Sequence, residues 1–246
     1  MFRTLGAALA MLLAAASAVH AQTRYVVGVE NIAYMPYYAY EDGRYGGFVR
    51  AVLDAFAADR GYAFEYRPLP IQRLYARFLD GTVDFKFPDA PEWRQELRAG
   101  HEIAYSAPVA DYVDGTIVPA GKPAAKDEIR TLGTVAGFTP WAWADDLGSG
   151  GAVLSENGSF EALLAQVLNG RVDAAYANVA VVRHQLDRLG RPGALVFAPD
   201  LPHVRGAYHL STTKHPDVIA EFDAWLAANA GRVAEIRRRF GIDGEE

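Results

Sequence analysis

The chain has 246 residues and no cysteine. Disulfides therefore cannot stabilise it, and its stability must come from hydrophobic cores. A chain of this length can bury one large core or two modest ones. The lack of cysteine also removes the residue to which exported bacterial lipoproteins attach their lipid.

Positive charge is also scarce. Lys and Arg number 24 against 30 Asp and Glu, a formal net charge of −6, and no basic run is longer than Arg237-Arg238-Arg239. An acidic chain without a basic patch is a poor partner for nucleic acid or for an anionic membrane surface. The sequence therefore argues against both of these partners.

A membrane-spanning run is missing as well. The apolar stretch 5–18 has roughly 14 residues, whereas a transmembrane helix needs ~20. Arg3 precedes this stretch, and Val19-His20-Ala21 places small residues where a signal peptidase cleaves. We expect residues 1–21 to be a cleaved signal peptide and the mature protein to be periplasmic without a lipid anchor. An uncleaved anchor is the alternative.

One short pattern occurs twice. LYARFLDGTVDF begins at Leu74 and LLAQVLNGRVDA begins at Leu163, and both carry Gly-x-Val-Asp at the same place. Each copy has the pattern of an amphipathic helix that stops at a glycine and leads into a strand. Two such units predict two α/β lobes of similar construction, with a ligand cleft between them.

The pattern along the chain predicts alternating strands and helices, which favours mainly parallel sheets flanked by helices. We expect strands over 25–30, 62–66, 83–87, 109–119, 132–135, 152–154, 172–176, 194–198 and 203–212. We expect helices over 48–60, 70–79, 140–147, 159–168, 178–189, 216–228 and 232–240. The tyrosine-rich stretch around Pro36 is expected to be a loop. The predicted domains are lobe 1 over 22–118, lobe 2 over 119–207 and a return to lobe 1 over 208–246, with two crossings that form a hinge.

Three segments carry a resemblance to a known family. They are GGFVRAVLDAFAADRGYAFEY, then DGTVDF followed by PEWRQE and IAYSAPV, and finally NGRVDAAYAN. In order and spacing they resemble the type II periplasmic solute-binding proteins of family 3, which include the amino-acid receptors of ABC importers. The resemblance implies a monomeric two-lobe fold, a small polar and carboxylate-bearing ligand, a membrane ABC permease as partner, and neither cofactor nor metal nor catalysis.

The same resemblance implies that Arg94 grips the ligand carboxylate, a task that suits the planar guanidinium. Here the segment is Pro91-Glu92-Trp93-Arg94 in place of the usual Thr-x-x-Arg, and Arg94 could instead pair with Glu92 or Glu96. Thr139 before Pro140 is expected to cap a helix whose N-terminus attracts an anion. Simple capping without a ligand is the alternative.

Asn178 departs from the family pattern. Amino-acid receptors carry an Asp near this position, which meets the ligand ammonium. Asparagine lacks that charge and is a good helix N-cap. A missing charge-assisted contact costs ~1.5–3 kcal/mol, so a simple α-amino acid is disfavoured as the ligand.

Further candidates for the cleft are aromatic or follow a strand. Aromatic walls suit flat rings or cations, although any one of these rings could belong to the core. Lys86 and Asp89 follow the third strand of lobe 1, at the carboxyl edge where open sheets bind ligands. The aromatic candidates are Tyr34, Tyr37, Trp93, Phe138, Trp141 and Trp143.

Other motifs fail for physical reasons. Ser211-Thr212-Thr213-Lys214 follows a strand and not a helix start, and 115–122 lacks the spacing of a P-loop. Two alternatives to transport stay open. The fold could serve a ligand sensor or partner-binding scaffold, or a small-molecule lyase that uses Asp89, Glu92 and Asp145.

Overall fold

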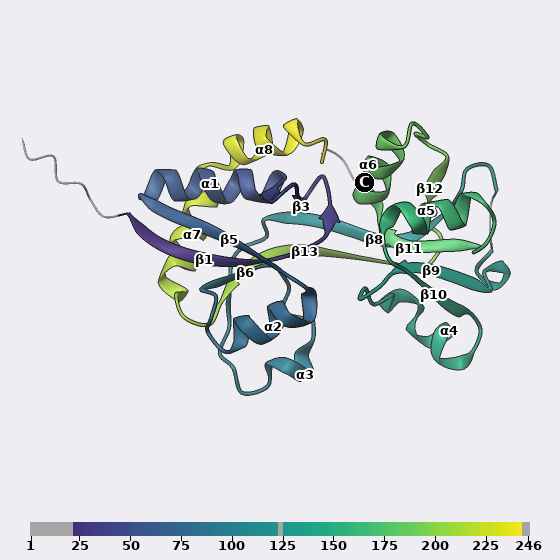
Figure 1. Cartoon of the computed structure of the whole chain (residues 1–246), viewed down its shortest axis with the longest axis horizontal. Coiled ribbons are helices and arrows are strands. Elements are labelled where there is room, and N and C mark those ends of the chain that lie inside the picture. The colour runs from purple at the N-terminus through teal and green to yellow at the C-terminus, as the bar shows by residue number, and fades with distance from the viewer. Residues whose placement is uncertain (1–21, 123–124, 243–246) are drawn as a thin grey trace, which may run out of the picture.

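The computed structural model describes residues 22–122 and 125–242. The predicted signal peptide, residues 1–21, lies outside the described residues. Within the described part of the chain, no helix is long and apolar enough to cross a membrane. The described residues form two lobes that lie side by side along the long axis of the molecule (Figure 1).

Strands and helices alternate along most of the chain, as predicted. The strands are β1 Thr23–Glu30, β2 Ala33–Tyr34, β3 Tyr38–Glu41, β4 Arg44–Gly46, β5 Tyr62–Leu69, β6 Phe85–Asp89, β7 Ala104–Tyr105, β8 Ala110–Pro119, β9 Thr131–Val135, β10 Val153–Asn157, β11 Ala174–Asn178, β12 Leu195–Phe197 and β13 His203–Thr212. The helices are α1 Phe48–Arg60, α2 Ile71–Leu79, α3 Gln95–Arg98, α4 Ala144–Ser149, α5 Phe160–Leu168, α6 Val179–Arg188, α7 Pro216–Ala228 and α8 Ala230–Arg239.

Ten strands join into one sheet that passes through both lobes. Its order is β10-β9-β11-β8-β13-β6-β1-β5, with β12 paired to β8 and β7 paired to β13. The outer strands of each lobe pair in parallel, β1 with β5 and β6, and β9 with β10 and β11. The α/β class is confirmed, and the sheet is mixed because the strands near its middle are antiparallel.

The strands β8 and β13 connect the lobes (Figure 1). They pair antiparallel with each other from Tyr208 opposite Ala110 to His203 opposite Gly115. β8 also pairs with β11 and β12 of one lobe, and β13 also pairs with β6 and β7 of the other. The predicted domain limits at 118/119 and 207/208 fall inside these two strands, where no loop marks a boundary. The limits therefore stay predictions.

The helices cover both faces of the sheet. In lobe 1, α1 and α8 lie on one face and α2 and α3 on the other, while α5 and α6 lie opposite α4 in lobe 2 (Figure 1). Helix α1 buries an apolar stripe that includes Val49, Val52 and Phe56. It ends at Gly61, whose positive φ of 70° lets its N–H bond back to the carbonyl of Ala57.

The repeated pattern performs the same structural task in both lobes. Asp84 accepts a hydrogen bond from the N–H of Val26 at 2.7 Å, and its own N–H donates to the Val26 carbonyl. Asp173 accepts from the N–H of Thr131 at 2.8 Å and donates to the Thr131 carbonyl. Each aspartate thus ties the start of one strand to the neighbouring strand. These side-chain hydrogen bonds take the place of regular strand pairing at Asp84 and Asp173. Strands β6 and β11 therefore begin two residues later than predicted.

A glycine also lies at equivalent places of the two units. A Cβ on Gly28 would lie 2.6 Å from Cδ1 of Leu74, and one on Gly133 would lie 2.6 Å from Cδ1 of Leu163. Both leucines are fully buried and open the repeated pattern. The close approach of helix to strand therefore favours glycine in both lobes, since any larger residue would displace these leucines.

We expect Gly28→Val and Gly133→Val each to lower the free energy of unfolding by about 1–3 kcal/mol, because the added methyls overfill a packed core. Gly46→Val is the matched control, since Gly46 lies on a strand with open space around its Cβ position. Urea denaturation measures the three differences. Equal effects at all three positions would contradict the packing argument.

Two predicted segments are wrong in detail. The tyrosine-rich stretch is not a loop but the small antiparallel sheet β2-β3-β4. The predicted helix over 140–147 is a 3-10 helix, Trp141–Trp143, followed by the short helix α4. Tyr34 and Tyr38 form a cross-strand pair of β2 and β3, and both are buried. The sequence of this stretch has no clear hydrophobic periodicity, so its strands depend on tertiary packing.

Candidate functional site

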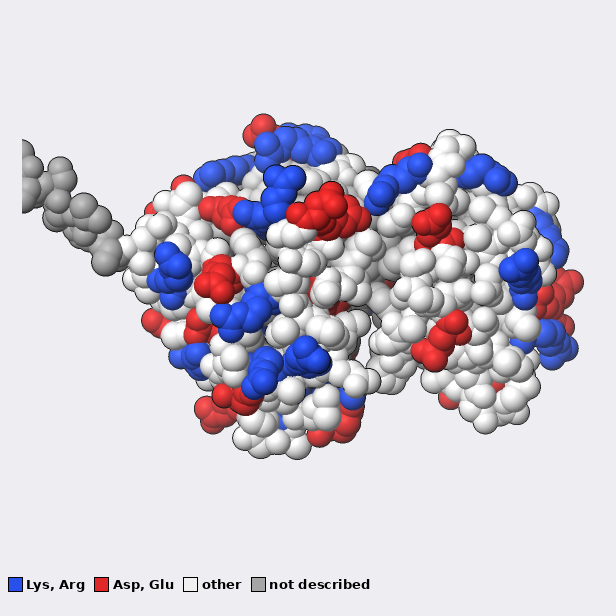
Figure 2. Space-filling view, in the orientation of Figure 1, with Lys and Arg blue, Asp and Glu red and all other residues white. Residues whose placement is uncertain are grey.

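A cleft of about 800 Å³, which includes space open to solvent, lies between the two lobes. Figure 2 shows the hollow that separates the two masses. Its wall contains residues from lobe 1, from the crossing strands and from lobe 2, as a cleft that closes over a ligand requires. The lining residues are Glu30, Tyr34, Tyr38, Ile71, Tyr75, Trp93, Arg94, Tyr112, Asp114, Gly137, Phe138, Thr139, Trp141, Tyr176, Val204 and Tyr208.

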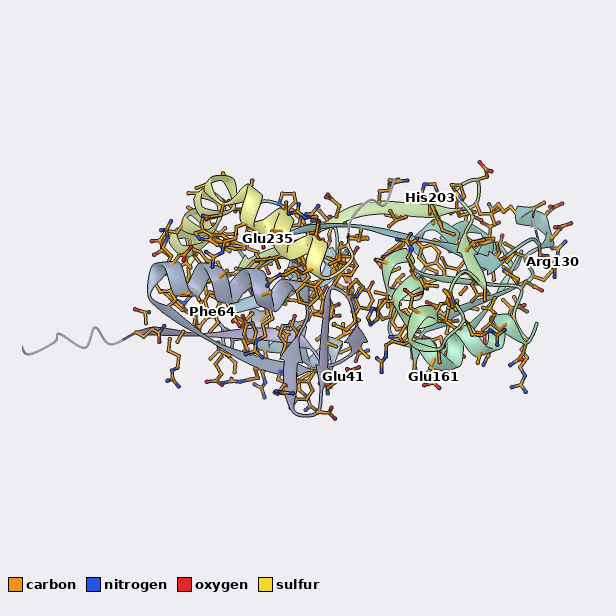
Figure 3. All side chains as sticks on the ribbon, turned by 90° about the horizontal axis from the view of Figure 1, so that it is seen from above. Glu41, Phe64, Arg130, Glu161, His203 and Glu235 are labelled. Atoms are coloured by element: carbon orange, nitrogen blue, oxygen red, sulfur yellow. The ribbon has the colours of Figure 1, made fainter. Side chains whose placement is uncertain are left out.

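Aromatic side chains form most of this wall and connect the lobes. Tyr34 of lobe 1 stacks on Phe138 of lobe 2, with ring centroids 5.7 Å apart and planes at 15°. Tyr112 and Tyr208 stack at 4.5 Å on the crossing strands. The lobes also meet at Glu41, at the end of β3, which pairs with Arg188 of α6 at 3.4 Å. Figure 3 labels Glu41 on lobe 1 and Glu161 on lobe 2.

Arg94 lines the cleft in a partly exposed position. Its backbone is left-handed, with φ 47°, and it precedes helix α3. The Nε donates to Glu96 at 2.6 Å, which is one of the two pairings expected from the sequence. The two terminal nitrogens of Arg94 make no hydrogen bond to any residue of the described chain, so the fork of the guanidinium stays accessible to an anion.

Thr139 also lines the cleft, but the reason given for it is wrong. Pro140 and not Thr139 precedes the 3-10 helix, and no side chain caps that helix. The short helix α4 begins only after Trp143. Thr139 therefore lines the cleft without a helix N-terminus behind it.

Asn178 is buried and does not line the cleft. Its Oδ1 accepts a hydrogen bond from the N–H of Val181 at 3.1 Å, which makes it the N-cap of α6. Its Nδ2 donates to Asp114 at 3.2 Å and lies 3.5 Å from the hydroxyl of Tyr208. Asn178 thus holds the carboxylate of Asp114, and Asp114, not Asn178, lines the cleft.

Two carboxylates of the cleft were not found from the sequence. Glu30 ends β1, and its Oε2 accepts a hydrogen bond from Tyr38 at 2.7 Å. Burial raises the pKa of Glu30, although Lys86 opposes this shift. Its position at the carboxyl end of a parallel strand was a usable signal. Asp114 lies inside strand β8, where the sequence pattern gave no signal.

Lys86 and Asp89 are fully buried and do not line the cleft, so the prediction that they face it is wrong. Lys86 donates to Asp89 at 3.0 Å, and Asp89 also accepts from Arg98 at 2.5 Å and from Ser211 at 2.5 Å. The four side chains form a polar cluster behind the wall of the cleft. Nζ of Lys86 lies 4.4 Å from the ring centroid of Tyr75, and Tyr75 itself lines the cleft.

Of the aromatic candidates, Tyr37 and Trp143 are core residues and do not line the cleft. The hydroxyl of Tyr37 donates to the carbonyl of Asp111 at 3.0 Å, and the indole N–H of Trp143 donates to Thr116 at 2.9 Å. The candidates that do line it are Tyr34, Trp93, Phe138 and Trp141. Among the described residues, no group of three or more His, Asp or Glu side chains could hold a metal ion.

Scans against protein-family models and against curated proteins find no match to the sequence. Solved structures do match over most of its length. An ancestral arginine-binding protein bound to arginine has a TM-score of 0.71 at 16% identity, covering 90% of this chain and 99% of that one. The arginine-, lysine-, histidine-binding protein ArtJ from Geobacillus stearothermophilus has a TM-score of 0.69 at 22% identity, covering 89% and 95%.

A third structure is the substrate-binding protein of an ABC uptake transporter from Streptococcus pneumoniae with bound histidine. It has a TM-score of 0.70 at 19% identity and covers 88% of this chain and 92% of that one. At these identities the likeness establishes the fold and not the ligand. The chain has the type II periplasmic-binding-protein fold, in the form found in amino-acid-binding proteins of ABC transporters.

Proposed function

We propose that the mature chain is a periplasmic receptor that binds a small, amino-acid-like solute and delivers it to a membrane ABC permease. The observation that carries this proposal is the interlobe cleft, whose wall is shared by both lobes and by the two crossing strands. Closure about β8 and β13 would bury a ligand between the lobes. The structural neighbours that bind arginine or histidine support a ligand of this size.

The charges of the wall suit a ligand that carries both signs. Arg94 supplies donors for a carboxylate, while Glu30 and Asp114 supply negative charge elsewhere in the cleft. Aromatic rings such as Trp93 and Phe138 cover the apolar part of the ligand. The cleft thus favours a carboxylate-bearing solute that also has a cationic group.

The test is a thermal-shift panel of amino acids, dicarboxylates, polyamines and aromatic acids on the mature protein. A cognate ligand at 1,000 times its dissociation constant stabilises by about 4 kcal/mol. At about 2–4 °C per kcal/mol for this chain length, we expect the melting temperature to rise by about 8–16 °C. Small-angle scattering should show a smaller radius of gyration with that ligand. A flat panel on well-folded protein free of copurified ligand would contradict the proposal.

Arg94→Ala should reduce the affinity for that ligand about 10- to 100-fold, the loss expected for one charge-assisted contact. Arg77→Ala is the matched control. Arg77 is an exposed arginine of lobe 1 that is also in an ion pair, with Asp80 at 3.1 Å, but it does not line the cleft. Equal affinities of the two variants in calorimetry would show that Arg94 does not hold the carboxylate.

A further inference from the structure

Asp114 occupies a special place in the cleft. It lies on the crossing strand β8, directly opposite Asn178 of β11 in the strand register. It is partly buried and lines the cleft, so its carboxylate lies between protein and ligand space. The Nδ2 of Asn178 donates to its Oδ1 at 3.2 Å, which fixes the orientation of the side chain.

Aromatic rings share this part of the cleft with Asp114. Tyr112 and Tyr208 stack on each other at 4.5 Å, and the hydroxyls of Tyr34 and Tyr208 lie 3.1 Å apart. Four tyrosines line the same cleft as Asp114, and burial raises the pKa of each of them, as does, to a smaller extent, the negative charge of Asp114. They are Tyr34, Tyr112, Tyr176 and Tyr208.

Such a wall attracts a cation for two reasons. The carboxylate supplies negative charge, and the faces of aromatic rings carry the negative part of their quadrupole. Arg94 is the one cationic side chain among the described residues that line the cleft, and Glu96 already balances its charge. Besides this ion pair, the wall carries two carboxylates, those of Glu30 and Asp114.

We propose that Asp114, held by Asn178 and flanked by the four tyrosines, is the subsite for a cationic amine of the ligand. This inference rests on the proposed receptor function and deepens it. The uncharged Asn178 positions the carboxylate, and Asp114 supplies the charge from the neighbouring strand. The absence of an acid at position 178 then no longer disfavours an α-amino acid.

The experiment compares amino acids with analogues that lack only the α-ammonium group. The probes are L-phenylalanine with 3-phenylpropionate, L-lysine with 6-aminohexanoate and L-glutamate with glutarate, measured by calorimetry on the mature protein. We expect the best-binding amino acid to exceed its deamino partner at least about tenfold. Asp114→Asn should reduce its affinity about 10- to 100-fold, the loss of one charge-assisted contact.

Two further variants make the result specific. Asp111→Asn is the matched control, because Asp111 lies on the same strand but is exposed and does not line the cleft. Its affinity should equal that of the unaltered protein. Adding Asn178→Asp to Asp114→Asn returns the charge to the neighbouring strand, and we expect it to recover part of the lost affinity.

The outcomes separate the two proposals. If deamino analogues bind as well as the amino acids, or if Asp114→Asn binds as tightly as Asp111→Asn, the amine subsite is wrong and the receptor function stands. If neither these probes nor any compound of the thermal-shift panel binds to folded protein, the receptor function itself is contradicted, and the subsite with it. Melting temperatures of the variants confirm that each is folded.

Discussion

Asp89→Ala is expected to destabilise the protein by about 3–5 kcal/mol, because it leaves buried cations without their partner. Asp89 accepts hydrogen bonds from Lys86, Arg98 and Ser211, and it is fully buried together with Lys86. Burial of an unpaired charge costs far more than the pair itself contributes. Urea denaturation of the mature protein measures the change.

The control is Glu65→Ala. Glu65 pairs with Arg67 at 3.1 Å on the surface, where an ion pair contributes little, so the change should stay below about 1 kcal/mol. The double variant Lys86→Met with Asp89→Ala removes one unpaired cation and should be less destabilised than Asp89→Ala alone. Similar losses for Asp89→Ala and Glu65→Ala would show that the buried cluster does not behave as an ion-pair network.

The same cluster predicts a pH dependence. Burial alone would raise the pKa of Asp89, but Lys86 and Arg98 outweigh it, so the pKa lies below the usual value of an aspartate. The carboxylate therefore stabilises the fold fully above the pKa of an unfolded aspartate, about 3.9. This contribution is lost as the pH falls below that value through the lower pKa of the folded state. The difference in stability between the unaltered protein and Asp89→Ala should shrink on acidification.

Tyr208→Ala is expected to cost about 3–5 kcal/mol, the range for loss of a large buried aromatic side chain. Tyr208 is buried on β13 and packs against a ring of the other crossing strand, β8, and against rings of lobe 1. Its ring neighbours are Tyr34, Tyr37, Phe87, Trp93 and Tyr112. Its loss would leave a cavity at the point where the lobes join.

Tyr208→Phe separates the ring from its hydroxyl. The hydroxyl lies 3.1 Å from that of Tyr34 and 3.5 Å from Nδ2 of Asn178, so its removal should cost about 1 kcal/mol. Thermal and urea unfolding of both variants give the comparison. If Tyr208→Ala costs no more than Tyr208→Phe, the ring does not hold the junction together.

Several elements could be predicted because their signals are local. Helix α7 and strand β13 have the predicted bounds, and α1 ends at Gly61 as its sequence indicates. Apolar spacing, glycine stops and the repeated Gly-x-Val-Asp pattern depend on neighbours along the chain. The small sheet β2-β3-β4 lacked such a signal, because tyrosine fits a buried strand as well as a loop.

The site was predictable only in part, because its residues come from segments that lie far apart in the sequence and leave no local signal. Arg94, Thr139 and four of the aromatic candidates line the cleft, while Lys86 and Asp89 are buried behind it. Asp89 bonds to Ser211, which is 122 positions away in the sequence. No pattern near Asp89 could reveal this partner or the burial that comes with it.

The sequence by itself determined two similar helix–strand units, their order and the two strands that cross between them, since these follow from periodicity and turn residues. The tertiary structure alone decided which charges face the ligand space. Arg98 pairs with Asp89 inside lobe 1, whereas Arg94 lies on the wall with Glu30 and Asp114. The direction of a side chain depends on what packs against it, and the segments that pack around this cleft lie far apart in the chain.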